Sequence, residues 1–136
     1  MATSLSQLMD GARSKVPEVS VADVKRSLGR KEVALVLDVR EPEEWSKGHI
    51  PHAVNVPRGW LELRADPASP IADPTLCADP AASIVAYCFQ APGVRSLLAA
   101  GTLIEMGYTN VTALSGGLRA WIDAGLPVEE PTRGDG

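Results

Sequence analysis

Three short runs of aliphatic and β-branched residues divide the chain and predict buried β-strands. They are residues 33–38, 83–88 and 110–114, and each is bounded by residues typical of turns or helix ends. None of the runs alternates polar with apolar residues, which indicates strands buried on both faces, as in a parallel sheet covered by helices. Weaker strand patterns occupy residues 18–21 and 53–56.

Segments with helical signals separate these strands. Residues 21–28 follow a serine that suits an N-cap, and residues 41–48 start with a proline and acidic residues that favour a helix N-terminus. Residues 92–106 carry few charges, so we expect a largely buried helix in which Gly101 allows close backbone packing. Residues 118–124 predict a last helix. Strands that alternate with helices predict an α/β fold.

The segment 63–82 interrupts this alternation. It repeats Ala-Asp-Pro, and an aspartate before a proline is disfavoured in a helix, so we expect a long surface excursion. We assign residues 1–15 to an N-terminal extension, 16–129 to one folded domain and 130–136 to a flexible C-terminal tail. The Arg-Gly-Asp triplet at 133–135 is interpreted as part of a solvated tail and not as an integrin-binding site.

Length and charge exclude several classes of protein. The 136 residues suit one domain, and 13 Lys/Arg against 17 Asp/Glu give a net charge of −4. Without a basic excess, nucleic-acid binding is disfavoured. The apolar runs are far shorter than the roughly 18 residues that cross a bilayer, and the first ten residues lack a secretory pattern. We therefore expect a cytoplasmic protein with neither a membrane nor a nucleic-acid partner.

The two cysteines decide which chemistry is available. Cys77 and Cys88 cannot make a disulfide framework, so each is interpreted as a buried thiol, a ligand or a nucleophile. Cys88 ends a predicted strand shortly before a helix, and loop and helix N–H groups converge at that edge of an α/β sheet. Those donors and the charge of Arg95 favour the thiolate, which is the reacting form. Cys88 is therefore either a nucleophile for an anionic substrate or a structural cysteine.

A charged pair is expected at the same edge of the sheet. Asp38 and Arg40 come directly at the end of another predicted strand. Two interpretations remain open for them. They orient the neighbouring loop or bind an oxyanion through the guanidinium fork, or they form an ion pair that only fixes the turn.

The remaining candidates are more simply explained by structure. Cys77 is interpreted as inert, although a resolving thiol remains an alternative. His52 is interpreted as a turn residue, with a place at a pocket rim as the alternative. A metal site built from the two histidines and the two cysteines lacks close-set ligand spacing, so we expect no metal. Core or helix packing is expected for the three tryptophans, which are Trp45, Trp60 and Trp121.

An ordered set of motifs covers most of the chain. The motifs are LDVREPEEW (37–45), GHIPHAVNVP (48–57), YC (87–88) with GVRS (93–96), MGYTNV (106–111) and LSGGLRAW (114–121). Together, and in this order, they resemble the rhodanese family in its single-domain form, over roughly residues 16–129.

The resemblance implies an α/β fold with a five-stranded parallel sheet and helices on both faces. It also implies a sulfurtransferase that needs no metal or organic cofactor. Cys88 would accept sulfane sulfur as a persulfide from thiosulfate or another small anionic donor, and a thiol or cyanide would then take the sulfur. Asp38 and Arg40 would be the supporting pair, and His49, Gly116 and Gly117 would be structural.

The loop after Cys88 departs from the family pattern. Six residues separate Cys88 from Arg95 where the family usually has four, and Pro92 offers no N–H to an amide cradle. The longer loop either widens the pocket or lets Phe89 cover the thiol. The residues that we assign to substrate binding are Phe89, Gln90, Ala91, Gly93, Val94 and Arg95.

Two other functions therefore remain open. One is a non-catalytic binding or regulatory module that keeps the fold but whose loop no longer closes around sulfur. The other is a cysteine-dependent arsenate reductase or phosphatase. The signature of that class is a cysteine, five residues and an arginine, and it fails here by one residue because Val94 stands at the arginine position.

Overall fold

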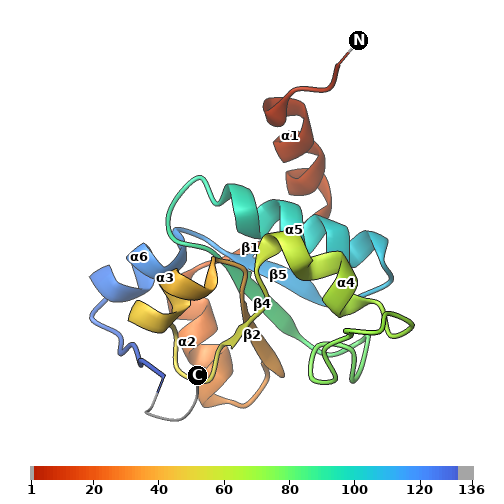
Figure 1. The fold of residues 1–136 in the computed structure, drawn as a ribbon. Coiled ribbons are helices and arrows are strands. Elements are labelled where there is room, and N and C mark those ends of the chain that lie inside the picture. The colour runs from red at the N-terminus through yellow and green to blue at the C-terminus, as the bar shows by residue number, and fades with distance from the viewer. Residues whose placement is uncertain (1, 132–136) are drawn as a thin grey trace.

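Five parallel strands form one sheet in the order β1-β5-β4-β2-β3. The structure is a computed structural model and describes residues 2–131. Residues 132–136, which include the Arg-Gly-Asp triplet, lie outside the described residues. In chain order the elements are α1 (Leu5–Lys15), β1 (Glu18–Val19), α2 (Val21–Gly29), β2 (Leu35–Asp38), α3 (Pro42–Lys47), β3 (Val54–Asn55), η1 (Arg58–Trp60), α4 (Leu61–Ala65), β4 (Ile84–Tyr87), α5 (Val94–Glu105), β5 (Val111–Leu114) and α6 (Gly117–Asp123) (Figure 1).

The sheet has a core on each face, which confirms the expected α/β architecture. Side chains of a strand point alternately to the two faces. Leu35 and Leu37 therefore pack with α1, α4 and α5, whereas Val36 packs with α2 and α6. Figure 1 shows these helices on the two sides of the sheet. Strands β2 and β4 are buried along their whole length, as the uninterrupted apolar runs predict.

Helix α1 is an element that the sequence analysis did not identify. Ser4 and Gln7 form a capping box at its start. Met9 and Ala12 belong to the core on the α5 side, and a Cβ built on Gly101 of α5 would lie 3.6 Å from the Cβ of Ala12. Gly101 thus permits the close helix packing that its position in α5 predicts. The N-terminal end of α1 projects beyond α5 (Figure 1).

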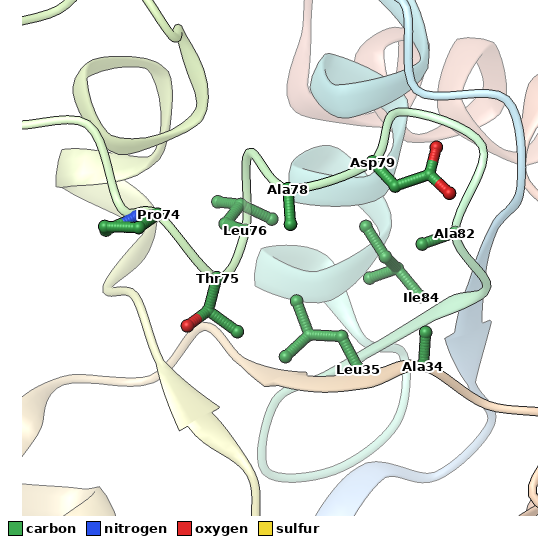
Figure 2. A pocket seen from close by; sticks show the side chains of 9 residues that line it. All are labelled: Ala34, Leu35, Pro74, Thr75, Leu76, Ala78, Asp79, Ala82 and Ile84. Atoms are coloured by element: carbon green, nitrogen blue, oxygen red, sulfur yellow. The ribbon is translucent and has the colours of Figure 1, made fainter.

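The segment with the Ala-Asp-Pro repeats runs over the amino ends of β2 and β4. In each repeat the aspartate side chain accepts a hydrogen bond from the backbone N–H two residues further on, which forms a local turn. Leu76 anchors the segment in the core. Figure 2 shows Leu35 and Ile84 below this segment, where they line a hollow of about 570 Å³. This hollow lies at the end of the strands opposite to Cys88.

One of the three tryptophans does not follow the expectation of a packing role. Trp121 is buried and Trp45 is half-buried, but Trp60 is 54% exposed. Trp60 ends the short helix η1, and the next residue, Leu61, takes the core position instead. Among residues 2–131, no helix combines the length and the apolar character that a membrane crossing requires.

Candidate functional site

Cys88 follows the central strand β4 at the carboxyl end of the sheet. Its side chain is 3% exposed and belongs to the core on the α5 side. The Sγ atom lies 3.3 Å from the hydroxyl of Ser96, which is itself buried in the first turn of α5. Sequence reasoning missed Ser96 as a partner, although it lies within the GVRS motif. The thiol is thus next to the start of α5 but shielded from solvent.

The loop between Cys88 and α5 forms a turn of its own. The N–H of Gly93 donates to the carbonyl of Gln90 at 3.0 Å, and Gly93 enters α5 with a left-handed φ of 77°. No side chain caps α5. Within residues 2–131, the hydrogen-bond partner of Cys88 Sγ is Ser96, and no loop N–H donates to the sulfur. The long loop therefore does not form the amide cradle in this conformation.

The side chains of the loop face different surroundings. Gln90, Ala91 and Pro92 are exposed, whereas Gly93 and Val94 are half-buried. Phe89 is half-buried and packs against the core on the α6 side. Because Cys88 belongs to the core on the α5 side, Phe89 points away from the thiol and does not cover it.

The start of helix α6 fixes the base of this loop. The N–H groups of Leu118 and Arg119, in the first turn of α6, donate to the carbonyls of Cys88 and Phe89 at 3.0 and 2.8 Å. Gly117 has a left-handed φ of 58°, and a Cβ at this position would lie 2.6 Å from the carbonyl oxygen of Cys88. The close approach of α6 to the loop therefore requires a glycine, which gives Gly117 the structural role expected for it.

Arg95 is held by a carboxylate from another helix. Its Nη1 lies 2.6 Å from Oε1 of Glu44 in α3, and Nη2 lies 3.3 Å from Oε2. Hydrogen bonding to Arg95 lowers the pKa of Glu44. The pKa of Arg95 is raised, first by the hydrogen bond to Glu44 and in smaller part by the charges of Cys88 and Asp38. Arg95 thus keeps its charge near Cys88. Glu44 escaped the sequence reasoning because nothing local pairs it with Arg95.

Asp38 and Arg40 form a buried ion pair. Arg40 Nη2 lies 2.7 Å from Asp38 Oδ2 and also donates to the carbonyl of Gly48 at 2.8 Å. The hydroxyl of Tyr87 donates to Asp38 Oδ2 at 2.7 Å and accepts the N–H of Ile50 at 3.1 Å. Burial and the charge of Asp38 raise the pKa of Tyr87. With its guanidinium engaged in this way, Arg40 has the geometry of an ion pair that fixes the turn after β2.

The structure does not bring Cys77 to Cys88. Cys77 Sγ donates to the carbonyl of Arg64 at 3.3 Å and lies 3.7 Å from the hydroxyl of Tyr108, just beyond the C-terminal end of α5. Cys88 lies at the other end of that helix, and twelve helical residues span about 18 Å. Both thiols are free. In the part of the chain that the structure describes, no three His, Cys, Asp or Glu side chains gather into a candidate metal site.

Two hollows flank the Cys88 loop. The first, of about 220 Å³, lies between the loop, α1 and the end of β5, and Ser96 is part of its wall. The second, of about 340 Å³, lies on the side of Phe89 and is lined by residues of α3 and α6. Cys88 itself lines neither hollow. The contact between Ser96 and Cys88 makes the first hollow the nearer route to the thiol.

Comparisons with known proteins place these features in a family context. The family model described as Rhodanese-like domain matches residues 20–124. A protein of Allochromatium vinosum named Sulfurtransferase is 31% identical over 116 residues, which cover 85% of this chain and 97% of that protein. The Thiosulfate:glutathione sulfurtransferase of Saccharomyces cerevisiae is 32% identical over 121 residues, which cover 82% of each chain. In eight of the curated relatives, the match spans from 51% to 97% of the relative's length.

A solved structure from Rhodopseudomonas palustris has the same fold. It is 36% identical to this chain, has a TM-score of 0.85 and is matched over 95% of this chain and 96% of its own. That protein is described as one of unknown function and as a "possible tyrosine phosphatase". The similarity therefore extends over the N-terminal helix as well as the sheet. The names of these similar proteins cover more than one type of cysteine chemistry.

Proposed function

Since this chain belongs to the rhodanese-like domain family of sulfurtransferases, we propose that it moves sulfane sulfur from thiosulfate or a related anionic donor to a thiol or cyanide acceptor. Cys88 carries the sulfur as a persulfide, and the loop from Phe89 to Arg95 binds the donor. The observation that supports this most is the position of Cys88 between the central strand and the uncapped start of α5. We place the reaction in the cytoplasm, where thiol acceptors are kept reduced.

The proposed reaction has two displacement steps. In the first, the Cys88 thiolate attacks the outer sulfur of thiosulfate, a new S–S bond forms, and the S–S bond of the donor breaks so that sulfite leaves with its electron pair. In the second, a thiolate or cyanide attacks the outer sulfur of the persulfide, and the Cys88 thiolate leaves. Arg95 and the free N–H groups at the start of α5 stabilise the anionic sulfur in both steps.

Access to the thiol requires a movement of the loop. Cys88 is 3% exposed, while Gln90, Ala91 and Pro92 are exposed and belong to neither hydrophobic core. We propose that these three residues move aside when the donor binds. The base of the loop stays in place because α6 holds the carbonyls of Cys88 and Phe89.

Intact-mass measurement tests the proposal. After incubation with thiosulfate, the wild-type protein is expected to gain one sulfur atom, and cyanide is expected to remove it. The Cys88→Ser variant is expected to show no adduct, whereas the matched control Cys77→Ser keeps it. An adduct that persists in Cys88→Ser, or no adduct on the wild-type protein with any sulfane donor, contradicts the proposal.

A second candidate is a non-catalytic binding or regulatory module. It is supported by the burial of Cys88 and by the lack, among residues 2–131, of a loop N–H that donates to its sulfur. Deletion of two loop residues distinguishes the candidates. A gain of sulfur transfer from an inactive parent favours the module, whereas a loss from an active parent favours an enzyme with a specialised loop.

The third candidate is phosphate-ester hydrolysis or arsenate reduction at the same thiolate. It is supported by the description of the Rhodopseudomonas palustris protein as a "possible tyrosine phosphatase". Turnover of an aryl phosphate or of arsenate, with no sulfur taken from thiosulfate, would replace the sulfurtransferase proposal by this one.

A further inference from the structure

The hollow on the α1 side of the Cys88 loop is built partly by the N-terminal segment. Gly93 and Ser96 form one wall, Ser115 and Gly116 follow β5, and Arg13 and Glu18 complete it from α1 and β1. Ser96 lies between this hollow and Cys88, with its hydroxyl 3.3 Å from Sγ. A donor that enters here lies beside Ser96, and a movement of Ala91 and Pro92, which also line the hollow, opens the way to the thiol.

Arg13 and Glu18 are the ionisable groups among the described residues that line this hollow. Their side chains are 42% and 39% exposed, and Arg13 Nε lies 3.7 Å from Glu18 Oε1, which is longer than a hydrogen bond. The other carboxylate oxygen of Glu18 accepts a hydrogen bond from Ser115 at 3.4 Å. Within residues 2–131, Arg13 makes no other ion pair. Its guanidinium is thus a cation with unused donors at the mouth of the hollow.

We propose that Arg13 binds the oxyanion group of the sulfur donor and so determines which donors the enzyme accepts. The inference rests on the proposed sulfurtransferase function. A thiosulfate ion that directs its outer sulfur to Cys88 directs its three oxygens away from it, toward the mouth of the hollow. A guanidinium matches such oxygens in charge and in hydrogen-bond geometry. Glu18 opposes the binding because its carboxylate repels a dianion and competes for Arg13.

The size of the hollow indicates the class of donor. Its volume of about 220 Å³ is below the roughly 300–1,000 Å³ of pockets that hold drug-sized ligands. A small inorganic donor or a short alkyl thiosulfonate fits this space better than a peptide persulfide. Because the oxygens stay anionic from the bound donor to released sulfite, Arg13 stabilises both the ground state and the transition state. Its loss therefore acts on KM more than on kcat.

Steady-state kinetics with thiosulfate and cyanide test the proposal through a pair of variants. Arg13→Gln is expected to raise KM for thiosulfate about fivefold, with little change in kcat. This is the size of effect expected when a partly exposed charge-assisted hydrogen bond to the substrate is lost. Glu18→Gln removes the opposing charge and keeps a polar partner for Ser115, so KM is expected to fall. Arg13→Lys keeps the positive charge, so its KM for thiosulfate is expected to lie between the KM values of the wild type and of Arg13→Gln.

The opposite changes in KM expected for Arg13→Gln and Glu18→Gln distinguish a role in substrate binding from a purely structural ion pair. If Arg13 and Glu18 only stabilised one another, both variants would shift KM in the same direction, and the proposal would be wrong. Arg26→Gln is the matched control, because Arg26 forms an exposed ion pair with Asp23 on α2, and its KM is expected to equal that of the wild type. An unchanged KM in Arg13→Gln, with the wild-type adduct present, overturns this inference alone. An absent wild-type adduct overturns the sulfurtransferase function.

Discussion

The carboxylate of Asp38 is the most thoroughly buried charge beside the Cys88 loop. It is fully buried, and its charge is balanced by Arg40, which is buried as well. The hydroxyl of Tyr87, one residue before Cys88, donates to the same carboxylate. The end of β2 and the end of β4 are thus joined by side chains directly below the loop. This network ties the turn after β2 to the end of β4, next to Cys88.

Replacing Asp38 by Asn is expected to lower the free energy of unfolding by about 3–5 kcal/mol, because the charge of Arg40 stays buried without its partner. Urea unfolding followed by circular dichroism measures this change. The control is Asp23→Asn, which removes an exposed ion pair with Arg26 and is expected to leave stability unchanged. Equal stability of Asp38→Asn and the wild type would show that the network contributes no stability.

At the scale of elements, the junction of β4, the loop and α6 positions the thiol. The first N–H groups of α6 lack partners inside the helix, and two of them bind the carbonyls of Cys88 and Phe89 instead. Gly116 and Gly117, both with left-handed φ, bring the start of α6 to this position. The helix terminus therefore completes the hydrogen bonds of the loop base and keeps Cys88 at the end of β4.

A methyl group at Gly117 is expected to break this junction. A Cβ there would lie 2.6 Å from the carbonyl oxygen of Cys88 and 2.8 Å from the carbonyl carbon of Phe89, so Gly117→Ala has to displace backbone. We expect slower adduct formation with thiosulfate and a lower melting temperature. Gly125→Ala has a similar φ of 77° but open space, so it is expected to cost only about 1 kcal/mol and to keep the adduct rate. The same adduct rate in both variants would contradict this account.

At the scale of the whole molecule, helix α1 contributes both to the hydrophobic core and to the surroundings of the Cys88 loop. Its buried face packs against α5, and Arg13 in its last turn lines the hollow beside the Cys88 loop. Lys15 of α1 also pairs with Glu105 at the far end of α5 at 2.7 Å. The last turns of α1 therefore contact α5, while its N-terminal end points away from it (Figure 1). The family model begins only at residue 20, after this helix.

Two substitutions on α1 compare the contributions of its buried face and its exposed face to the free energy of unfolding. Met9 is buried in the core, whereas Leu8 is 51% exposed. Met9→Ala is expected to lower the free energy of unfolding by about 2–3 kcal/mol, because it leaves a cavity against α5. Leu8→Ala makes a similar truncation on the same helix and is expected to change stability by less than about 0.5 kcal/mol. Similar losses for the two variants in urea unfolding would indicate that α1 does not pack as described.

The sequence by itself determined the secondary structure around the site and the place of Cys88 within it. Uninterrupted apolar runs predicted β2, β4 and β5, and turn residues predicted where their helices begin and end, because these signals act over a few neighbouring residues. The same local pattern set Cys88 between a strand and a helix start. Helix α1 was missed because its apolar residues lie on two faces, only one of which is buried, although the Ser4–Gln7 capping box marks its start.

Only the tertiary structure decided which groups surround the thiol. Glu44 and Arg95 are 51 residues apart in the chain, and their ion pair exists because α3 and α5 meet at one edge of the sheet. Arg13 reaches the Cys88 loop for the same kind of reason, since the packing of α1 on α5 fixes its position. The burial of Cys88 against Ser96 depends on how the long loop closes. Contacts of this kind arise from the packing of distant segments, and no local pattern of residues records them.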